Sequence, residues 1–276
     1  MTEHHQIDLR HLFDLEPHGP DTFVGIGPRY PWGGLFGGQI VAQALRAATA
    51  TVDEALPVHS LRAYFIRRGD NREPIRFEVD RIRNGRSFAT RRVVARQPNG
   101  AILNLEASFQ MPEDTNDIQS VQVDPAIPGP DELVNDSWSE SFERRIVPPE
   151  HLRDGVRTGH GRAAIWMKVS NPLGDDQLLH RCWLAYLSDE VPTDAVRAGN
   201  PEGSASDAQN FYASLDHSIW FHRPVQADEW HLYDFTCHNF TGARGLAIGH
   251  VFRSDGTHVA TVAQEVLMRT ARDRQD

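Results

Sequence analysis

Tyr64-Phe65-Ile66-Arg67-Arg68 and Trp220-Phe221-His222-Arg223-Pro224 are the two stretches of sequence that decide the fold. Each ends a predicted strand, and the two stretches begin 156 positions apart (220 − 64). The glycines of two predicted hairpin turns, Gly100 and Gly256, have the same spacing (256 − 100). Two landmarks with one offset indicate a duplicated unit. We therefore expect a pseudo-twofold fold with its site at the seam, where only one copy needs to keep the chemistry.

The first unit is predicted to be one helix followed by an antiparallel meander. The glycine-rich stretch 33–38 (GGLFGG) precedes an Ala-rich run, 39–48, in which apolar residues recur at i, i+3, i+4 and i+7 from Val41. The turns Asn84-Gly85 and Asn99-Gly100 predict hairpins. This combination is typical of an α+β fold in which a sheet wraps around a small-residue helix. The expected strands are 58–68, 74–84, 87–97 and 101–111.

The second unit repeats this plan after a stretch rich in Pro, Asp, Glu and Ser. We expect a unit at 1–111, a linker at 112–158 with one short strand near Phe142–Val147, and a second unit at 159–276. Within the second unit we expect a helix at 176–189 and a loop at 194–210. Its expected strands are 163–169, 214–223, 230–240, 243–253 and 258–269.

Composition limits the class of protein. The chain has 276 residues and a net charge of −10, which argues against general nucleic-acid binding. No apolar run approaches the roughly 20 residues of a membrane helix, and the N-terminus lacks the basic and apolar regions of a secretory signal. Cys182 and Cys237 fit no disulfide or zinc pattern, so we expect reduced thiols in a cytoplasmic protein. No phosphate-binding loop or dinucleotide fingerprint is present, and we predict no cofactor and no metal.

Asp189 is the first candidate for chemistry. The second helix has an apolar stripe at Leu179, Cys182, Trp183 and Tyr186, and Asp189 continues it seven residues after Cys182. A carboxylate on a core-facing stripe is costly unless it is paired or hydrogen-bonded. The alternative is that Asp189 merely ends the helix with its side chain turned to solvent.

Gln264 is the second candidate, because it shares the apolar face of the last strand with Val262 and Val266. A buried amide needs hydrogen-bond partners. The segment 214–222 is also rich in polar groups, and strict alternation places Ser214 on one face with Asp216, Ser218, Trp220 and His222.

A Ser-His-Asp triad in this segment is disfavoured. The chain has no G-x-S-x-G elbow, and Asp216 and His217 are neighbours on opposite strand faces. His217 and His222 have no third metal ligand at a recognisable spacing, so we expect structural hydrogen bonds for both.

Two further features can bind an anionic group. Gly37-Gly38 at the start of the first helix can donate backbone N–H groups to a developing oxyanion, with Gly38 the candidate. A locally basic segment is either the exposed faces of a hairpin or a phosphate-binding rim. Its arginines are Arg81, Arg83, Arg86, Arg91, Arg92 and Arg96.

Several of these motifs together resemble the type II acyl-CoA thioesterases (TesB-like), which have a double hotdog fold. The resemblance covers nearly the whole chain, with its motifs in the family's order. They are residues 36–45 (FGGQIVAQAL), 58–61 (VHSL), 64–67 (YFIR), 83–88 (RNGRSF), 107–110 (ASFQ), 215–224 (LDHSIWFHRP), 243–245 (ARG) and 264–265 (QE).

The resemblance implies two tandem hotdog units, each an antiparallel sheet wrapped around a central helix, and hydrolysis of fatty acyl-CoA to free acid and CoA. It implies that Asp189, Ser214 and Gln264 hold the attacking water, without a covalent intermediate. Ser214 stands where many relatives have Thr, and both offer one hydroxyl. Arg68 replaces a proline, which we interpret as structural.

The predicted reaction leads us to expect a place for each part of the substrate. The acyl chain is expected between helix and sheet, and Gly38 is expected to stabilise the oxyanion. The CoA phosphates are expected at Arg83, Arg86, Arg91 and Arg92. A homo-oligomer is also expected.

Two rival functions remain open. A hotdog enoyl-CoA hydratase or dehydratase needs a paired Asp and His near a helix start, and neither predicted helix has one. A non-catalytic acyl-CoA-binding protein would bind ligand without turnover.

Overall fold

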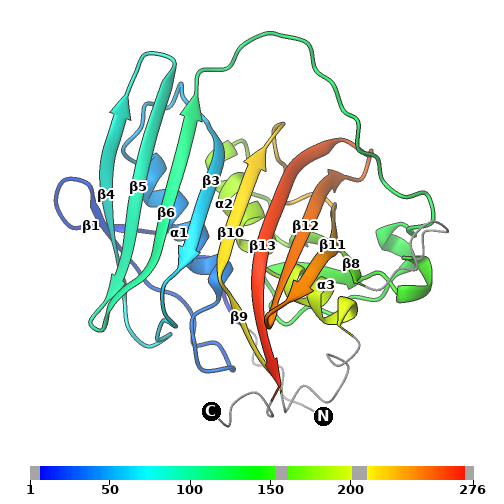
Figure 1. Ribbon diagram of the computed structural model, residues 1–276. Helices are drawn as coiled ribbons and strands as arrows, with labels where there is room; N and C mark the ends of the chain where they lie inside the picture. Colours follow the sequence, from blue (N-terminus) through cyan, green and yellow to red (C-terminus); the bar gives the residue numbers. More distant parts are fainter. Residues whose placement is uncertain (1–6, 153–160, 201–209, 271–276) are drawn as a thin grey trace.

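The computed structural model describes residues 7–152, 161–200 and 210–270. In this part of the chain one 13-stranded antiparallel sheet wraps around α1 and α2 (Figure 1). The helices are α1 Gly37–Thr49, α2 Gln177–Leu187 and α3 Pro192–Gly199, with short 3-10 turns η1 Pro130–Glu132 and η2 Pro149–His151. The strands are β1 Glu16–Pro17, β2 Thr22–Gly25, β3 Val58–Phe65, β4 Ile75–Asn84, β5 Phe88–Gln97, β6 Gly100–Gln110, β7 Phe142–Ile146, β8 Arg162–Val169, β9 Asn210–Ser214, β10 Asp216–Phe221, β11 His231–Thr241, β12 Arg244–Arg253 and β13 His258–Thr270.

The duplication predicted from the sequence is confirmed by the strand order. The path β4-β5-β6-β3 is followed by β10-β13-β12-β11, so the two meanders meet at the β3–β10 pair in the middle of the sheet (Figure 1). In this pair Arg62 lies directly opposite Ser218, and the two residues are 156 positions apart (218 − 62). The pseudo-twofold axis therefore passes between Arg62 and Ser218.

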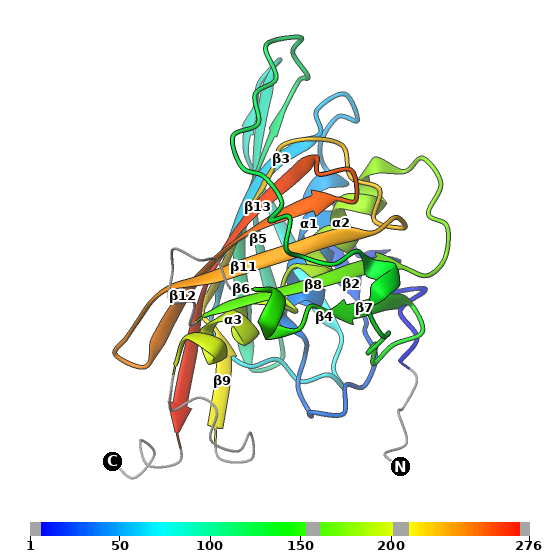
Figure 2. The same ribbon diagram turned by 90° about the vertical axis from the view of Figure 1, so that its right-hand side faces the viewer.

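Both long helices lie on the same face of the sheet (Figure 2). α1 is buried along most of its length, and its alanines leave room for close packing. A Cβ on Gly38 would lie only 2.2 Å from the backbone oxygen of Tyr186 in α2. Glycine at this position therefore lets the start of α1 touch the end of α2, across the seam between the two units.

The predicted elements are mostly confirmed, with two corrections. The expected loop at 194–210 begins as a helix, α3, because Pro192 at its first turn favours helix initiation; residues 201–209 of that loop lie outside the described residues. The expected strand 214–223 is interrupted at Leu215, and its two parts, β9 and β10, pair with β13 in registers that differ by one residue.

The segment predicted as a linker is attached to the second half of the sheet. Its short strand is confirmed as β7, which pairs with β8. Further upstream, the Gln119 side chain accepts a hydrogen bond from the His258 N–H at 2.8 Å. The limits predicted for the units and linker stay a prediction. Among the residues described, the structure has no helix of the length and apolarity that crossing a membrane requires.

Candidate active site

Asp189 lies at the end of α2 and faces the interior. Ser188 is the C-cap of this helix, and the Asp189 side chain is only 7% exposed. The alternative in which the carboxylate turns to solvent is wrong, because the apolar stripe continues past the last helical turn. A buried carboxylate at this place requires hydrogen-bond donors.

Two donors from different units contact this carboxylate. The backbone N–H of Gly38, at the start of α1, donates to Asp189 Oδ2 at 2.8 Å. Ser214 Oγ donates to Asp189 Oδ1 at 3.2 Å. A Cβ on Gly37 would lie 2.5 Å from Asp189 Oδ2, so the helix start can approach only because this residue is glycine.

Ser214 reaches this site through a β-bulge. Leu215 donates its N–H to the Glu265 oxygen, while the Glu265 N–H is taken by the Asp216 carboxylate instead of by a backbone carbonyl. The extra residue reverses the alternation of faces. The prediction that Ser214 shares a face with Asp216 is therefore wrong, and Ser214 points to the side of Gln264.

Gln264 has no exposed surface and joins the same network. Its Nε2 donates to Ser214 Oγ at 2.9 Å. The predicted burial of Gln264 on the apolar face of the last strand is confirmed. The structure thus brings together Asp189, Ser214 and Gln264, the three residues that the family resemblance implied.

His217 is a member of this network that the sequence reasoning did not connect to it. Its Nδ1 contacts Gln264 Oε1, and its Nε2 lies 2.9 Å from Ser188 Oγ. The expected role in hydrogen bonding is confirmed, but the partner was not foreseen. Alternation of His217 with Ile219 and Phe221 is a signal that places this ring in the core.

Burial shifts the pKa values of Asp189 and His217 in opposite directions. Burial raises the pKa of Asp189 to about 6, while the nearby polar groups of Gln264, Ser214 and the Gly38 N–H oppose this rise. Burial lowers the pKa of His217 to about 4. At neutral pH the site therefore holds a carboxylate beside an uncharged imidazole.

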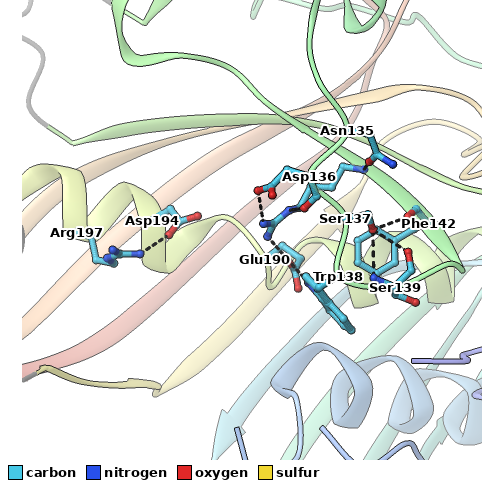
Figure 3. A network of polar contacts seen from close by, with 10 residues as sticks. Asn135, Asp136, Ser137, Trp138, Ser139, Phe142, Glu190, Asp194 and Arg197 are labelled. Carbon is cyan, nitrogen blue, oxygen red and sulfur yellow. Dashed lines mark hydrogen bonds and ion pairs between the residues drawn. The ribbon is translucent and has the colours of Figure 1, made fainter. Parts of the chain in front are cut away.

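A second buried carboxylate, Glu190, follows Asp189 and belongs to a structural network (Figure 3). Glu190 Oε2 accepts hydrogen bonds from Trp138 Nε1 at 3.2 Å and Arg144 Nη1 at 3.0 Å. Burial raises the pKa of Glu190, and Arg144 opposes this. Trp138 also packs edge-on against Phe36, whose next neighbour is Gly37. The segment before β7 thus fixes both sides of the Asp189 site.

The structure removes Arg91 from the phosphate-binding candidates. Its side chain is 2% exposed, and its five N–H donors are used by Thr51 Oγ1, Asn84 Oδ1 and three backbone carbonyls. A guanidinium with all donors satisfied inside the protein has none left for a phosphate. Arg91 instead ties the end of α1 to the β4–β5 hairpin.

The other arginines of this segment are exposed, but they lie in different places. Arg92 pairs with Asp80 at 3.0 Å on the outer face of the sheet. Arg83 and Arg86 belong to the hairpin beside the C-terminal end of α1, whereas Asp189 contacts its N-terminal end. A 13-residue helix is about 20 Å long. Only the far end of a long ligand would reach this hairpin from Asp189.

The predicted oxyanion donor is already engaged in this structure. The Gly38 N–H points at Asp189 Oδ2 rather than at open space, so it holds the carboxylate in place. Within the described residues, no group of three or more His, Cys, Asp or Glu side chains is arranged to hold a metal ion.

Comparison with known proteins places this arrangement in a family. Residues 27–110 match the model of the acyl-CoA thioesterase N-terminal domain, and residues 115–268 match that of the acyl-CoA thioesterase C-terminal domain. Acyl-coenzyme A thioesterase 8 of Mus musculus is 35% identical over 94% of this chain and 88% of its own length. Acyl-CoA thioesterase 2 of Haemophilus influenzae is 32% identical over 95% of this chain and 97% of its own.

Solved structures agree with this match. The acyl-CoA thioesterase II TesB2 of Mycobacterium marinum is 37% identical, covers 95% of this chain and 98% of its own, and superposes with a TM-score of 0.85. A hot dog fold protein of Alicyclobacillus acidocaldarius, 19% identical, covers 93% of this chain and 96% of its own with a TM-score of 0.73, which bears on the fold alone. The predicted double hotdog is confirmed.

Proposed function

Since the chain belongs to the acyl-CoA thioesterase family and hydrolyses acyl-CoA, we propose that Asp189, Ser214 and Gln264 hold the attacking water. The observation that carries this assignment is the buried carboxylate of Asp189, which meets donors from both units at the seam. Each Asp189 oxygen keeps a free lone pair beside the bond it already accepts, so a water molecule has an acceptor there.

In the proposed reaction Asp189 acts as general base. The water oxygen bonds to the thioester carbonyl carbon while one water proton passes to the carboxylate. The C–S bond then breaks, and the proton passes from Asp189 to the leaving CoA sulfur. Ser214 and Gln264 orient the water, so the step gains from proximity and orientation. A carboxyl with a pKa of about 6 is suited to this exchange near neutral pH.

A serine nucleophile is a poorer account of the same geometry. Ser214 donates to a carboxylate and accepts from an amide, and the nearest imidazole, His217, bonds to Gln264 and Ser188 instead. Within the described part of the chain Ser214 contacts no imidazole, and the carboxylate that accepts its proton is the group proposed to activate water, so we favour direct attack by water and no covalent intermediate.

The substrate is proposed to be a fatty acyl-CoA whose acyl chain lies between the helices and the sheet. Aromatic side chains next to the carboxylate support this placement, because Phe65 lies close to Gly37 and Phe36 packs against Tyr186 at 4.9 Å between ring centroids. For the CoA phosphates we retain only the exposed Arg83, Arg86 and Arg92. A cytoplasmic location and a homo-oligomer stay predictions.

One structural feature, which the sequence analysis did not predict, favours the alternative function of an enoyl-CoA hydratase. The Asp228 carboxylate lies 3.6 Å from His180 Nδ1 near the start of α2. Both ring nitrogens are used, however, by the Ala227 N–H and the Gly174 oxygen. An imidazole bound to backbone at both nitrogens is suited to holding a loop rather than to proton transfer.

Free-thiol release from a panel of acyl-CoAs, short to long, tests the assignment. Asp189→Asn and Gln264→Ala are compared with the wild type and with Asp228→Asn as a control carboxylate. We expect Asp189→Asn to lower kcat by about 10²–10⁴-fold with its fold intact. A fully active Asp189→Asn enzyme would refute the role. Hydration of crotonyl-CoA without thiol release, lost in Asp228→Asn, would favour the hydratase.

A further inference from the structure

We propose that His217 is a positioning residue for the hydrolysis, because it fixes the orientation of the Gln264 amide and so aims Gln264 Nε2 at Ser214. This inference rests on the proposed role of Gln264. It concerns a group that has no direct contact with Asp189 and acts through a neighbour.

The contacts leave His217 little freedom. The ring has no exposed surface, and both nitrogens are engaged, Nδ1 by Gln264 Oε1 and Nε2 by Ser188 Oγ at 2.9 Å. Ser188 is the residue just before Asp189 and caps α2. His217 therefore connects the end of the helix that carries the carboxylate to the strand that carries the amide.

The direction of the hydrogen bonds follows from the charge at Asp189. A carboxylate only accepts, so the Ser214 proton points to it, and Ser214 Oγ must then accept from Gln264 Nε2. Gln264 Oε1 is left facing His217, which requires the proton on Nδ1 and an acceptor at Nε2. The donors run in one direction, from His217 through Gln264 and Ser214 to Asp189. The Ser188 hydroxyl lies within hydrogen-bond distance of both the Ala185 oxygen (3.1 Å) and His217 Nε2 (2.9 Å), and in this arrangement it turns its one proton to Nε2.

The opposite tautomer would break this order. With its proton on Nε2, His217 would accept at Nδ1, and the amide of Gln264 would turn its NH₂ toward the ring. Gln264 Oε1 would then compete with Asp189 for the Ser214 proton. The tautomer of His217 thus decides whether the Ser214 hydroxyl donates its hydrogen bond to Asp189.

The first unit shows that the fold does not require this polar pair. The 156-residue offset relates His217 to Leu61, and the residue opposite Leu61 in the β3–β6 ladder is Ala107; both are buried and apolar. In β10 and β13 the same ladder, one step beyond the Ser218–Ala263 pair, brings His217 to Gln264. The polar pair occurs in the unit that carries Asp189, which is expected if it serves the reaction.

Three substitutions at this position separate the hydrogen bond from packing. An Asn side chain places its amide nitrogen where Nδ1 lies and keeps the donor for Gln264. A Gln side chain reaches instead toward Ser188, and Leu, the residue of the first unit, keeps volume alone. We expect His217→Asn to retain most of kcat, and His217→Gln and His217→Leu to lose about 10- to 100-fold with KM within about twofold. His231→Leu, which removes another buried imidazole of the same unit, is the control for packing.

A double-mutant cycle identifies the route of the effect. If His217 acts through Gln264, the His217→Leu/Gln264→Ala enzyme has the kcat of Gln264→Ala alone, within about twofold. The proposal would be overturned if the losses of kcat in the two single variants multiply in the double variant. It would also be overturned if the Asn and Gln variants are equally active, or if His217→Leu keeps the wild-type kcat. If His217→Leu does not fold, the Asn and Gln variants carry the comparison. A fully active Gln264→Ala enzyme would instead refute the proposed site, which keeps the two failures distinct.

Discussion

The backbone N–H of Gly38 donates to the carboxylate of Asp189 at 2.8 Å, although the two residues are 151 positions apart in sequence. Gly38 belongs to the first unit and Asp189 to the second. The site is therefore assembled by the packing of one helix start on another helix end, and changes in that contact are expected to change catalysis.

A methyl group at Gly37 tests this contact. Its Cβ would lie 2.5 Å from Asp189 Oδ2 and 3.1 Å from Phe65, so we expect Gly37→Ala to displace the carboxylate. A misplacement of about 1 Å can cost about 100-fold in rate, and kcat/KM is the quantity to measure. Gly129→Ala is the matched control, because its Cβ would meet nothing closer than Glu132 Oε1 at 3.6 Å. Equal activity of both variants would contradict the expectation.

The pH dependence of kcat/KM reports the ionisation of Asp189. Burial raises its pKa to about 6, and only the carboxylate accepts a proton from water. We expect kcat/KM to rise about tenfold per pH unit below pH 6 and to level off above it. The neutral His217, with a pKa of about 4, contributes no limb above pH 5. A profile that stays flat down to pH 5 would exclude Asp189 as the base.

The difference in stability between the wild type and Asp189→Asn is expected to depend on pH in a defined direction. A carboxyl whose folded pKa is raised binds its proton more tightly when folded, so stability falls as pH rises from about 4 through about 6. The charged form then costs up to about 3 kcal/mol at pH 8. Urea unfolding should find Asp189→Asn more stable than wild type at pH 8 and similar to it near pH 4. If the wild type is instead the more stable protein at pH 8, the hydrogen bonds to the carboxylate outweigh the cost of its burial.

Arg144 is expected to stabilise the fold by neutralising Glu190. Their ion pair is 3.0 Å long, and the side chains are 18% and 7% exposed. Removing one partner of a buried pair costs about 3–5 kcal/mol, because the other charge is left without compensation. We expect Arg144→Met to lower the free energy of unfolding by about 3 kcal/mol. Adding Glu190→Gln should recover much of the loss, and an additive loss would contradict a paired carboxylate.

Periodicity and turn motifs predict most of the secondary structure, and periodicity singles out two of the three proposed site residues. Asp189 and Gln264 interrupt apolar faces, and such an interruption is visible without a structure. Ser214 was assigned to the site only by family resemblance, since the bulge at Leu215 depends on how Asp216 bonds to a neighbouring strand. Arg91 was misjudged because its burial depends on Thr51, which lies 40 residues away. Contacts of this range are set by tertiary packing.

The apolar pair Leu61–Ala107 shows what fusing two units into one chain permits. In a symmetric dimer of identical subunits, any change at this place would alter both copies of the site together. In a fused chain each copy mutates independently, so one can lose its polar groups while the other retains them. The first unit is then constrained by packing and by the helix start that contacts Asp189, while the second unit carries the polar side chains of the proposed site.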